Sequence, residues 1–179
     1  MKQLFILRHA QALGTQTGGT DKTRPLSPKG HEDAKALGGL MAREGLQPDQ
    51  VLCSSATRTC ETLDGVMESL SSCKIEYMDR LYNADFDALL GAIREVSSDI
   101  ERVLLVAHNP GVHTLAARLS KDDESAAVDR LMMSYAPATL SVLECAHAEW
   151  GDVAPYAQRL VSLHEAVEYN SSDRPTRWM

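Results

Sequence analysis

The sequence lacks the closely spaced cysteine pairs that are typical of structural zinc sites and of redox-active disulfides. The four cysteines are scattered along the chain, at Cys53, Cys60, Cys73 and Cys145. No CxxC pair occurs, and zinc sites and thioredoxin-like redox sites both need such close pairs. No internal repeat or low-complexity block is present either, and a composition of 44% hydrophobic and 24% charged residues excludes fibrous and disordered chains. We therefore expect a globular protein with reduced thiols.

Long hydrophobic runs are also missing. No stretch approaches the roughly 20 apolar residues that a membrane-spanning helix needs. The first residues, MKQLFIL, resemble the start of a signal peptide, but this run is too short and Arg8-His9 interrupts it. The sequence thus predicts a cytoplasmic protein without a membrane partner.

Basic residues are fewer than acidic residues in this chain. The chain has 18 Lys and Arg against 25 Asp and Glu, which gives a net charge of −7. An acidic surface repels nucleic acid, so nucleic acid is not an expected partner. A length of 179 residues fits one domain with a core that needs neither metal nor disulfide. We expect residues 1–169 to form this domain, residues 170–179 to be a loosely held tail, and the protein to be a monomer.

Apolar runs of strand length alternate with amphipathic helical stretches. Strands are expected over residues 2–7, 51–53, 75–78, 103–107, 139–145 and 159–164. Helices are expected from Pro28, capped by Ser27 and closed by Gly45, then after Ser55, over 85–97 and after Asn109-Pro110. The stretch 120–138 is expected to be irregular. This order predicts an α/β fold, with a mostly parallel central sheet and helices on both faces.

Polar groups follow three of these strands directly. Arg8-His9 ends the first, Ser54 to Arg58 follows the second, and His108-Asn109 follows the strand over 103–107. In a parallel sheet such groups gather beyond the carboxyl ends of the strands. Arginine forks suit phosphate, and helix N-termini add positive potential, so we expect a pocket for a tetrahedral phosphoryl group.

The two histidines suggest how this pocket could act. A neutral imidazole is a competent nucleophile, so His9 is expected to attack phosphorus and form a phosphohistidine that water later opens. Arg8 and Arg58 would stabilise the charge on the oxygens, and His108 would donate a hydrogen bond to them. A metallohydrolase needs three or more protein ligands, and only two histidines converge. We therefore expect no metal.

Four ordered segments resemble a known family. LFILRHAQA resembles the RHG signature of the histidine phosphatase superfamily, with Ala10 where glycine is usual. CSSATRTCET resembles the second-arginine motif of this family, and LLVAHNPG its second-histidine motif. RPLSPKG resembles the RPLT-x-x-G segment of the small SixA-type phosphohistidine phosphatases. Order and spacing match that branch over nearly all of residues 1–145.

The resemblance implies a phosphoglycerate-mutase-like α/β fold and a cofactor-free phosphatase. Carried over position by position, His9 is the phosphorylated nucleophile, and Arg8, Arg58 and His108 form the phosphate pocket. Arg24, in the RPL segment, is expected to contact the substrate. Asn109 is expected to cap a helix, with a contact to phosphate as the alternative.

One feature of larger family members has no clear match. They supply an acid after the third strand to protonate the leaving group. Here only Asp85 and Asp87 are candidates, and both are better explained as solvated residues at a helix start. Phosphohistidine in a partner protein tolerates this lack, because a protonated imidazole leaves more easily than an alkoxide. Small phosphoesters remain an alternative substrate, and a non-catalytic phosphate-binding module an alternative function.

Overall fold

A computed structural model describes residues 1–121 and 125–170 of the chain. Within these residues six strands form one sheet in the order β3-β2-β4-β1-β5-β6. Their bounds are β1 Lys2–Arg8, β2 Gln50–Ser54, β3 Lys74–Met78, β4 Arg102–Ala107, β5 Leu140–Cys145 and β6 Arg159–His164. Strands β3, β2, β4 and β1 run parallel. Strand β5 pairs antiparallel with β1, and the edge strand β6 pairs antiparallel with β5. The predicted α/β fold with a mostly parallel central sheet is confirmed.

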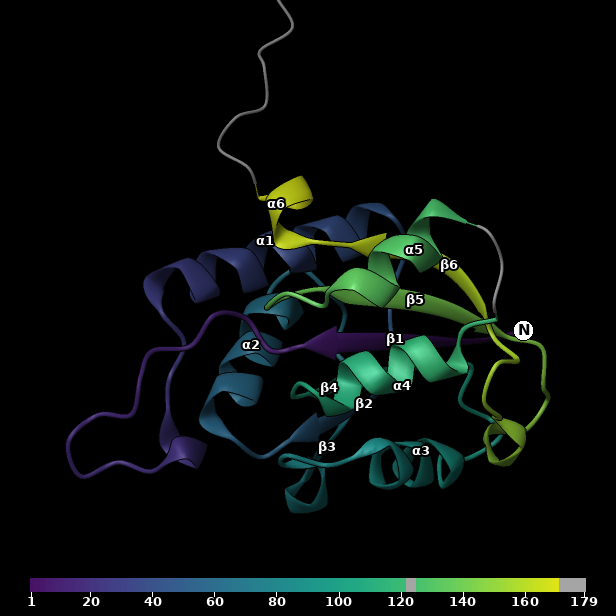
Figure 1. The fold of residues 1–179 in the computed structure, drawn as a ribbon, viewed down its shortest axis with the longest axis horizontal. Coiled ribbons are helices and arrows are strands. Elements are labelled where there is room, and N and C mark those ends of the chain that lie inside the picture. Colours follow the sequence, from purple (N-terminus) through teal and green to yellow (C-terminus); the bar gives the residue numbers. More distant parts are fainter. Residues whose placement is uncertain (122–124, 171–179) are drawn as a thin grey trace, which may run out of the picture.

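Helices cover both faces of this sheet (Figure 1). Their bounds are α1 Pro28–Arg43, α2 Thr57–Met67, α3 Phe86–Arg94, α4 Gly111–Leu119, α5 Ala126–Met133 and α6 Ala166–Tyr169. Side chains alternate along a strand, so Leu4 and Ile6 of β1 pack with α3, α4 and α5. Phe5 and Leu7 face the opposite way and pack with α1 and α2. The central strands are thus buried on both sides, which explains their uninterrupted apolar sequences.

The first helix begins and ends as its sequence predicts. The Ser27 side chain accepts a hydrogen bond from the Gly30 amide at 3.0 Å, which satisfies one of the free donors of the first turn. Gly45 follows the helix with φ +68°, a conformation that glycine adopts without steric cost.

Two helix starts differ from expectation. Helix α2 begins at Thr57, because the Ser55 hydroxyl donates to the Asp79 carboxylate instead of capping the helix. Helix α4 begins at Gly111, because the Asn109 side chain donates to the Tyr135 carbonyl at 3.0 Å. The predicted capping roles of Ser55 and Asn109 are therefore wrong.

The stretch 120–138 is more regular than its sequence suggests, since it contains α5, whose Val128 and Leu131 are buried. The charged residues 122–124 lie outside the described part of the chain. So does the predicted tail from residue 171 onward, while Asn170 donates to Asp33 at 2.7 Å. None of the helices in the described ranges is long and apolar enough to cross a bilayer.

Helices α1 and α2 approach each other closely at Gly38. A Cβ atom placed there would lie 2.3 Å from the Val66 carbonyl oxygen of α2. Gly39, one position further along α1, points elsewhere, and a Cβ atom there would meet nothing nearer than an Arg43 side-chain nitrogen at 3.6 Å. The packing of α1 against α2 therefore requires glycine at position 38 but not at position 39.

We expect Gly38→Ala to lower the free energy of unfolding by about 1–3 kcal/mol, because the helices must separate to admit the methyl group. Gly39→Ala is the matched control and should raise it by up to about 1 kcal/mol through helix propensity. Urea unfolding followed by circular dichroism measures both. Equal effects of the two substitutions would contradict the close approach.

Candidate active site

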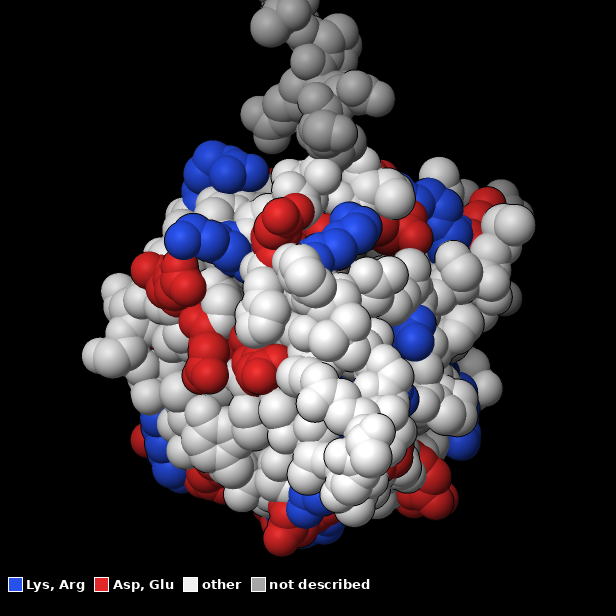
Figure 2. Space-filling view, turned by 90° about the vertical axis from the view of Figure 1, so that its left-hand side faces the viewer, with Lys and Arg blue, Asp and Glu red and all other residues white. Residues whose placement is uncertain are grey.

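The carboxyl ends of three parallel strands lie side by side. Arg8 at the end of β1 is in register with Ala107 at the end of β4, and Cys53 of β2 is in register with Val106. The residues that follow these strands are His9, Ser54 to Arg58, and His108. The β1 arrow in Figure 1 points to the left, and Figure 2 faces that side of the molecule. There, acidic and basic groups lie close together along the upper and left-hand parts of the face, and much of the remaining face is uncharged.

His9 is held in one orientation by its own backbone. Its Nδ1 lies 2.7 Å from the Ala10 carbonyl oxygen, which can only accept, so Nδ1 carries the proton. The other ring nitrogen, Nε2, is therefore left with a lone pair. Arg58 donates to this lone pair through its Nε at 3.3 Å. The arrangement leaves an unprotonated, positioned nitrogen, which is what a nucleophile requires.

His108 lies next to His9, with ring centroids 5.3 Å apart. Its Nε2 is 2.7 Å from the Ser54 hydroxyl. That hydroxyl also accepts from the Ala56 amide at 3.5 Å, and it can donate its own proton to His108. In this tautomer Nδ1 of His108 carries a proton, and in the described residues this buried atom has no hydrogen-bond partner.

Both imidazoles are neutral at neutral pH. Burial is the main cause that lowers the pKa of His9 to about 4, and the charges of Arg58, Arg8 and Arg24 lower it further. The pKa of His108 falls to about 3, again chiefly through burial, with Arg58 as the next cause. That the same arginines act on both rings shows that these groups share one electrostatic environment.

Arg58 connects the histidines to the loop between β1 and α1. Only 4% of Arg58 is exposed. Its Nη1 donates to the Asp21 backbone oxygen at 2.7 Å, and its Nη2 to the Asp21 carboxylate at 3.2 Å. The Tyr82 hydroxyl also donates to this carboxylate, at 2.5 Å. Hydrogen bonds from Tyr82 and Arg24, in that order, lower the pKa of Asp21 to about 2.

Arg8 is held by a different segment of the chain from the one that holds Arg58. Its Nη1 donates to the Tyr135 carbonyl at 2.7 Å, and the Asn109 side chain donates to the same oxygen. Two buried polar atoms here, Arg8 Nε and Asn109 Oδ1, have no partner among the described residues. An unsatisfied guanidinium donor beside two neutral imidazoles suits an oxyanion.

For the remaining predicted site residues, the structure gives no direct hydrogen bond to His9 or His108. Arg24 donates to the Leu13 carbonyl at 2.8 Å and to Asp21 at 3.0 Å, so it joins Arg58 through that carboxylate. Its contact with substrate, like that of Asn109, stays a prediction. Asp85 accepts from the Ala88 amide at 3.0 Å as the N-cap of α3, and Asp87 lies exposed in the same first turn.

Sequence reasoning missed three residues that shape the site, namely Tyr82, Tyr135 and Asp21, and it placed Ser54 at this edge without giving it a partner. The long polar loop over residues 14–23 was the available signal for Asp21, since loops of this length often carry function. No pattern in the sequence pairs Tyr82 or Tyr135 with residues so distant along the chain.

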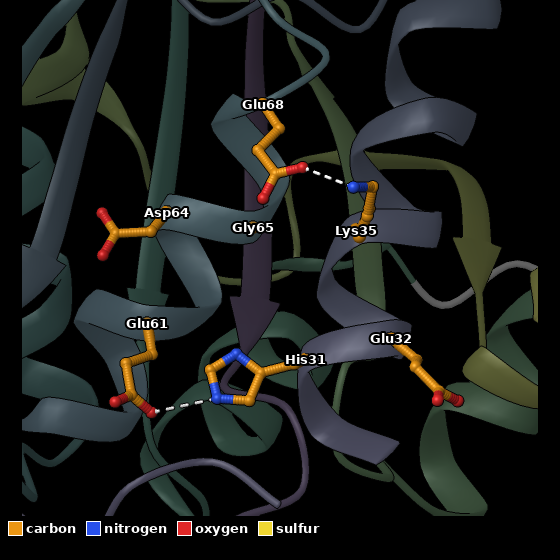
Figure 3. A pocket seen from close by; sticks show the side chains of 7 residues that line it. All are labelled: His31, Glu32, Lys35, Glu61, Asp64, Gly65 and Glu68. Carbon is orange, nitrogen blue, oxygen red and sulfur yellow. Dashed lines mark ion pairs between the residues drawn. The ribbon is translucent and has the colours of Figure 1, made fainter. Parts of the chain in front are cut away.

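A pocket between α1 and α2 differs chemically from the site around His9 and His108 (Figure 3). It has a volume of about 290 Å³ and is lined by His31, Glu32, Lys35, Glu61, Asp64, Gly65 and Glu68. Two ion pairs cross it, His31 with Glu61 at 3.7 Å and Lys35 with Glu68 at 2.9 Å. Four carboxylates repel phosphate, so this pocket is not the phosphoryl site. No group of three or more potential metal ligands occurs in the ranges that the structure describes.

Comparison with known proteins agrees with the family resemblance of the sequence motifs. Residues 4–101 match the family model for the histidine phosphatase superfamily (branch 1), a range that includes His9 and Arg58 and ends before His108. An uncharacterised protein of Mycobacterium tuberculosis is 31% identical over 160 residues, which cover 88% of this chain and 98% of that one. A 2,3-bisphosphoglycerate-dependent phosphoglycerate mutase of Porphyromonas gingivalis is 35% identical over 97 residues, covering 51% of this chain and 38% of the mutase.

Solved structures are similar over nearly the whole chain. One from Nakamurella multipartitia, which bears the name SixA, has a TM-score of 0.81 at 30% identity. The match covers 92% of this chain and 95% of that one. The protein histidine phosphatase SixA complexed with tungstate has a TM-score of 0.75 at 18% identity, over 93% of this chain and 98% of that one. The second likeness concerns the fold alone.

We expect His9 to titrate near pH 4 and His108 near pH 3 in ¹⁵N–¹H NMR spectra of the imidazole groups. Because both pKa values lie below the value of about 6.5 in an unfolded chain, the folded state binds fewer protons. The free energy of unfolding should therefore fall as the pH drops from 6.5 toward 4. The double variant His9→Asn, His108→Asn should show a weaker fall, and titration of His9 near pH 6.5 would contradict the buried geometry.

Proposed function

The chain belongs to the histidine phosphatase superfamily, in its SixA-type branch, and we propose that it is a phosphatase that works through a phosphohistidine at His9. In this proposal Arg8, Arg58 and His108 hold the phosphoryl group, and the substrate is phosphohistidine in a partner protein. One observation carries it: Nε2 of His9 is unprotonated and lies 3.3 Å from the Nε of a buried arginine. A nucleophilic nitrogen and a cation for the phosphoryl oxygens are thus adjacent.

The reaction proceeds in two displacements. Nε2 of His9 attacks phosphorus opposite the leaving group, whose bond to phosphorus breaks with the electron pair leaving on its nitrogen or oxygen. Water then attacks the phosphorylated His9, which returns the free imidazole and releases inorganic phosphate. Arg58 and Arg8 stabilise the charge on the equatorial oxygens in both steps.

The unsatisfied donors support the choice of ligand. Arg8 Nε and His108 Nδ1 are buried and have no acceptor within the described chain. A phosphoryl oxygen beside His9 supplies acceptors for such groups, and charge-assisted hydrogen bonds of this kind are stronger than neutral ones. The cost of leaving these donors unpaired in the free protein then becomes binding energy for the substrate.

Phosphohistidine is favoured over a phosphoester because no carboxylic acid in residues 1–121 and 125–170 is placed to protonate an alkoxide. Asp85 is engaged as a helix cap, and the low pKa of Asp21 keeps it ionised. A phosphohistidine peptide, a sugar phosphate and a nucleotide, assayed with a chelator present, distinguish the substrate classes. A large preference for the sugar phosphate would overturn the phosphohistidine proposal while leaving the phosphatase in place.

His9→Ala should abolish turnover of a phosphohistidine peptide, since the attacking nitrogen is gone, while orthovanadate still binds through the arginines. Wild-type protein quenched during turnover should carry a phosphate that is labile in acid and stable in alkali, and His9→Ala should carry none. The exposed His31, changed to Ala, is the control and should behave as wild type. Normal turnover by His9→Ala would remove His9 from this role.

Arg58→Lys should lower kcat by roughly 10²-fold, the scale expected when one transition-state donor is lost. A lysine ammonium is a point charge and cannot contact His9 Nε2 and Asp21 at once as the planar guanidinium does. Arg43→Lys, at an exposed position at the end of α1, is the matched control. Steady-state kinetics on the same peptide would show an unchanged rate if Arg58 were only structural.

A further inference from the structure

The Asp21 carboxylate lies at the edge of the site, separated from the nucleophile by one guanidinium group. Arg58 donates to His9 Nε2 through Nε and to Asp21 through Nη2 and Nη1. A phosphoryl group on His9 Nε2 and its leaving group therefore come within reach of this carboxylate. Nothing in the proposed chemistry so far uses it.

Asp21 retains capacity for one more hydrogen bond. Its Oδ2 accepts from Arg58 and Tyr82, whereas its Oδ1 accepts from Arg24 alone. A carboxylate has about four acceptor positions, so Oδ1 has one left. The side chain is 47% exposed, so a ligand can reach it. Asp21 thus combines a fixed position, a negative charge and a free acceptor.

We propose that Asp21 recognises the imidazole of the phosphohistidine substrate, by accepting a hydrogen bond from the ring nitrogen that does not carry the phosphoryl group. This inference rests on the proposed function and names the residue that selects its substrate class. Asp21 contacts the substrate in this role but forms no bond to phosphorus.

The hydrogen bond has a chemical consequence. A carboxylate at the distal nitrogen favours its protonated form, as a nearby negative charge favours any cation. When His9 attacks, the phosphorus–nitrogen bond breaks and its electrons go to the substrate ring, which leaves as neutral imidazole with the distal proton still in place. No separate acid is needed, which agrees with an ionised Asp21.

The same charge acts against other substrates. Leaving groups that carry carboxylates or further phosphates would be repelled by Asp21. The charged and titratable neighbours of Asp21 are Arg58 from α2, Arg24 from its own loop and Tyr82 after β3. Lys22 adds a positive charge 5.7 Å from the Tyr82 ring and pairs with Asp79. Of the two carboxylates, Asp21 contacts Arg58, whereas Asp79 contacts Lys22.

Asp21→Asn tests this role, because it removes the charge and keeps the shape. We expect kcat/KM for a phosphohistidine peptide to fall by at least about tenfold, the effect of one charge-assisted hydrogen bond. The rate on p-nitrophenyl phosphate, whose leaving group has no N–H, should fall by a smaller factor, because this substrate loses only the contact of Asp21 with Arg58 and not a hydrogen bond to the leaving group. Asp79→Asn, an exposed acid bonded to Lys22 and Ser55, is the matched control and should leave both rates unchanged.

The pH profile separates recognition from a structural role. Rates on phosphohistidine should fall as the pH rises through the pKa of the distal ring nitrogen. Asp21→Asn should move this fall to lower pH, and Asp21→Glu should move it back. Equal losses on both substrates, or an unshifted profile, would overturn the role of Asp21. A wild-type protein that hydrolyses p-nitrophenyl phosphate but not phosphohistidine would instead overturn the proposed substrate.

Discussion

The hydrogen bond from Arg58 to His9 is the interaction on which the rest of the site depends. It requires that Nε2 of His9 keep its lone pair, which the bond from Nδ1 to the Ala10 carbonyl ensures. It also requires a guanidinium that is buried and turned to one side, which the two contacts with Asp21 provide. A single planar cation thus links the proposed nucleophile to the loop that carries Asp21.

The fold makes this contact by bringing strand ends together, and it does so at a cost in stability. Burial lowers the pKa of His9 and of His108, and donors on Arg8 and His108 remain buried without partners among the described residues. Sites that keep such groups ready for a ligand depart from the usual rule of full hydrogen bonding. The apolar packing on both faces of β1 and β4 offsets that cost.

The sequence predicts the scaffold well because its signals are local. Apolar runs that end abruptly in Arg8-His9 and His108 mark buried strands and the edge at which they finish. The cap at Ser27 and the glycine at position 45 mark α1. Helix α5 escapes prediction because it is short and follows a charged stretch.

The details of the site escape prediction because they are long-range. Asp21 meets Arg58 across 37 positions and Tyr82 across 61, and the conformation of an irregular loop decides both contacts. Ser55 and Asn109 look like helix caps, but tertiary partners, Asp79 and the Tyr135 carbonyl, compete for their side chains. Local preference gives way wherever a distant group offers a stronger hydrogen bond.

A crystal structure with orthovanadate bound is the sharpest test of the site at His9, because it locates the phosphoryl group without turnover. We expect one oxyanion, with vanadium in line with Nε2 of His9 and its oxygens contacted by Arg8, Arg58 and His108. Vanadate bound elsewhere, with the His9 site empty at saturating concentration, would contradict it.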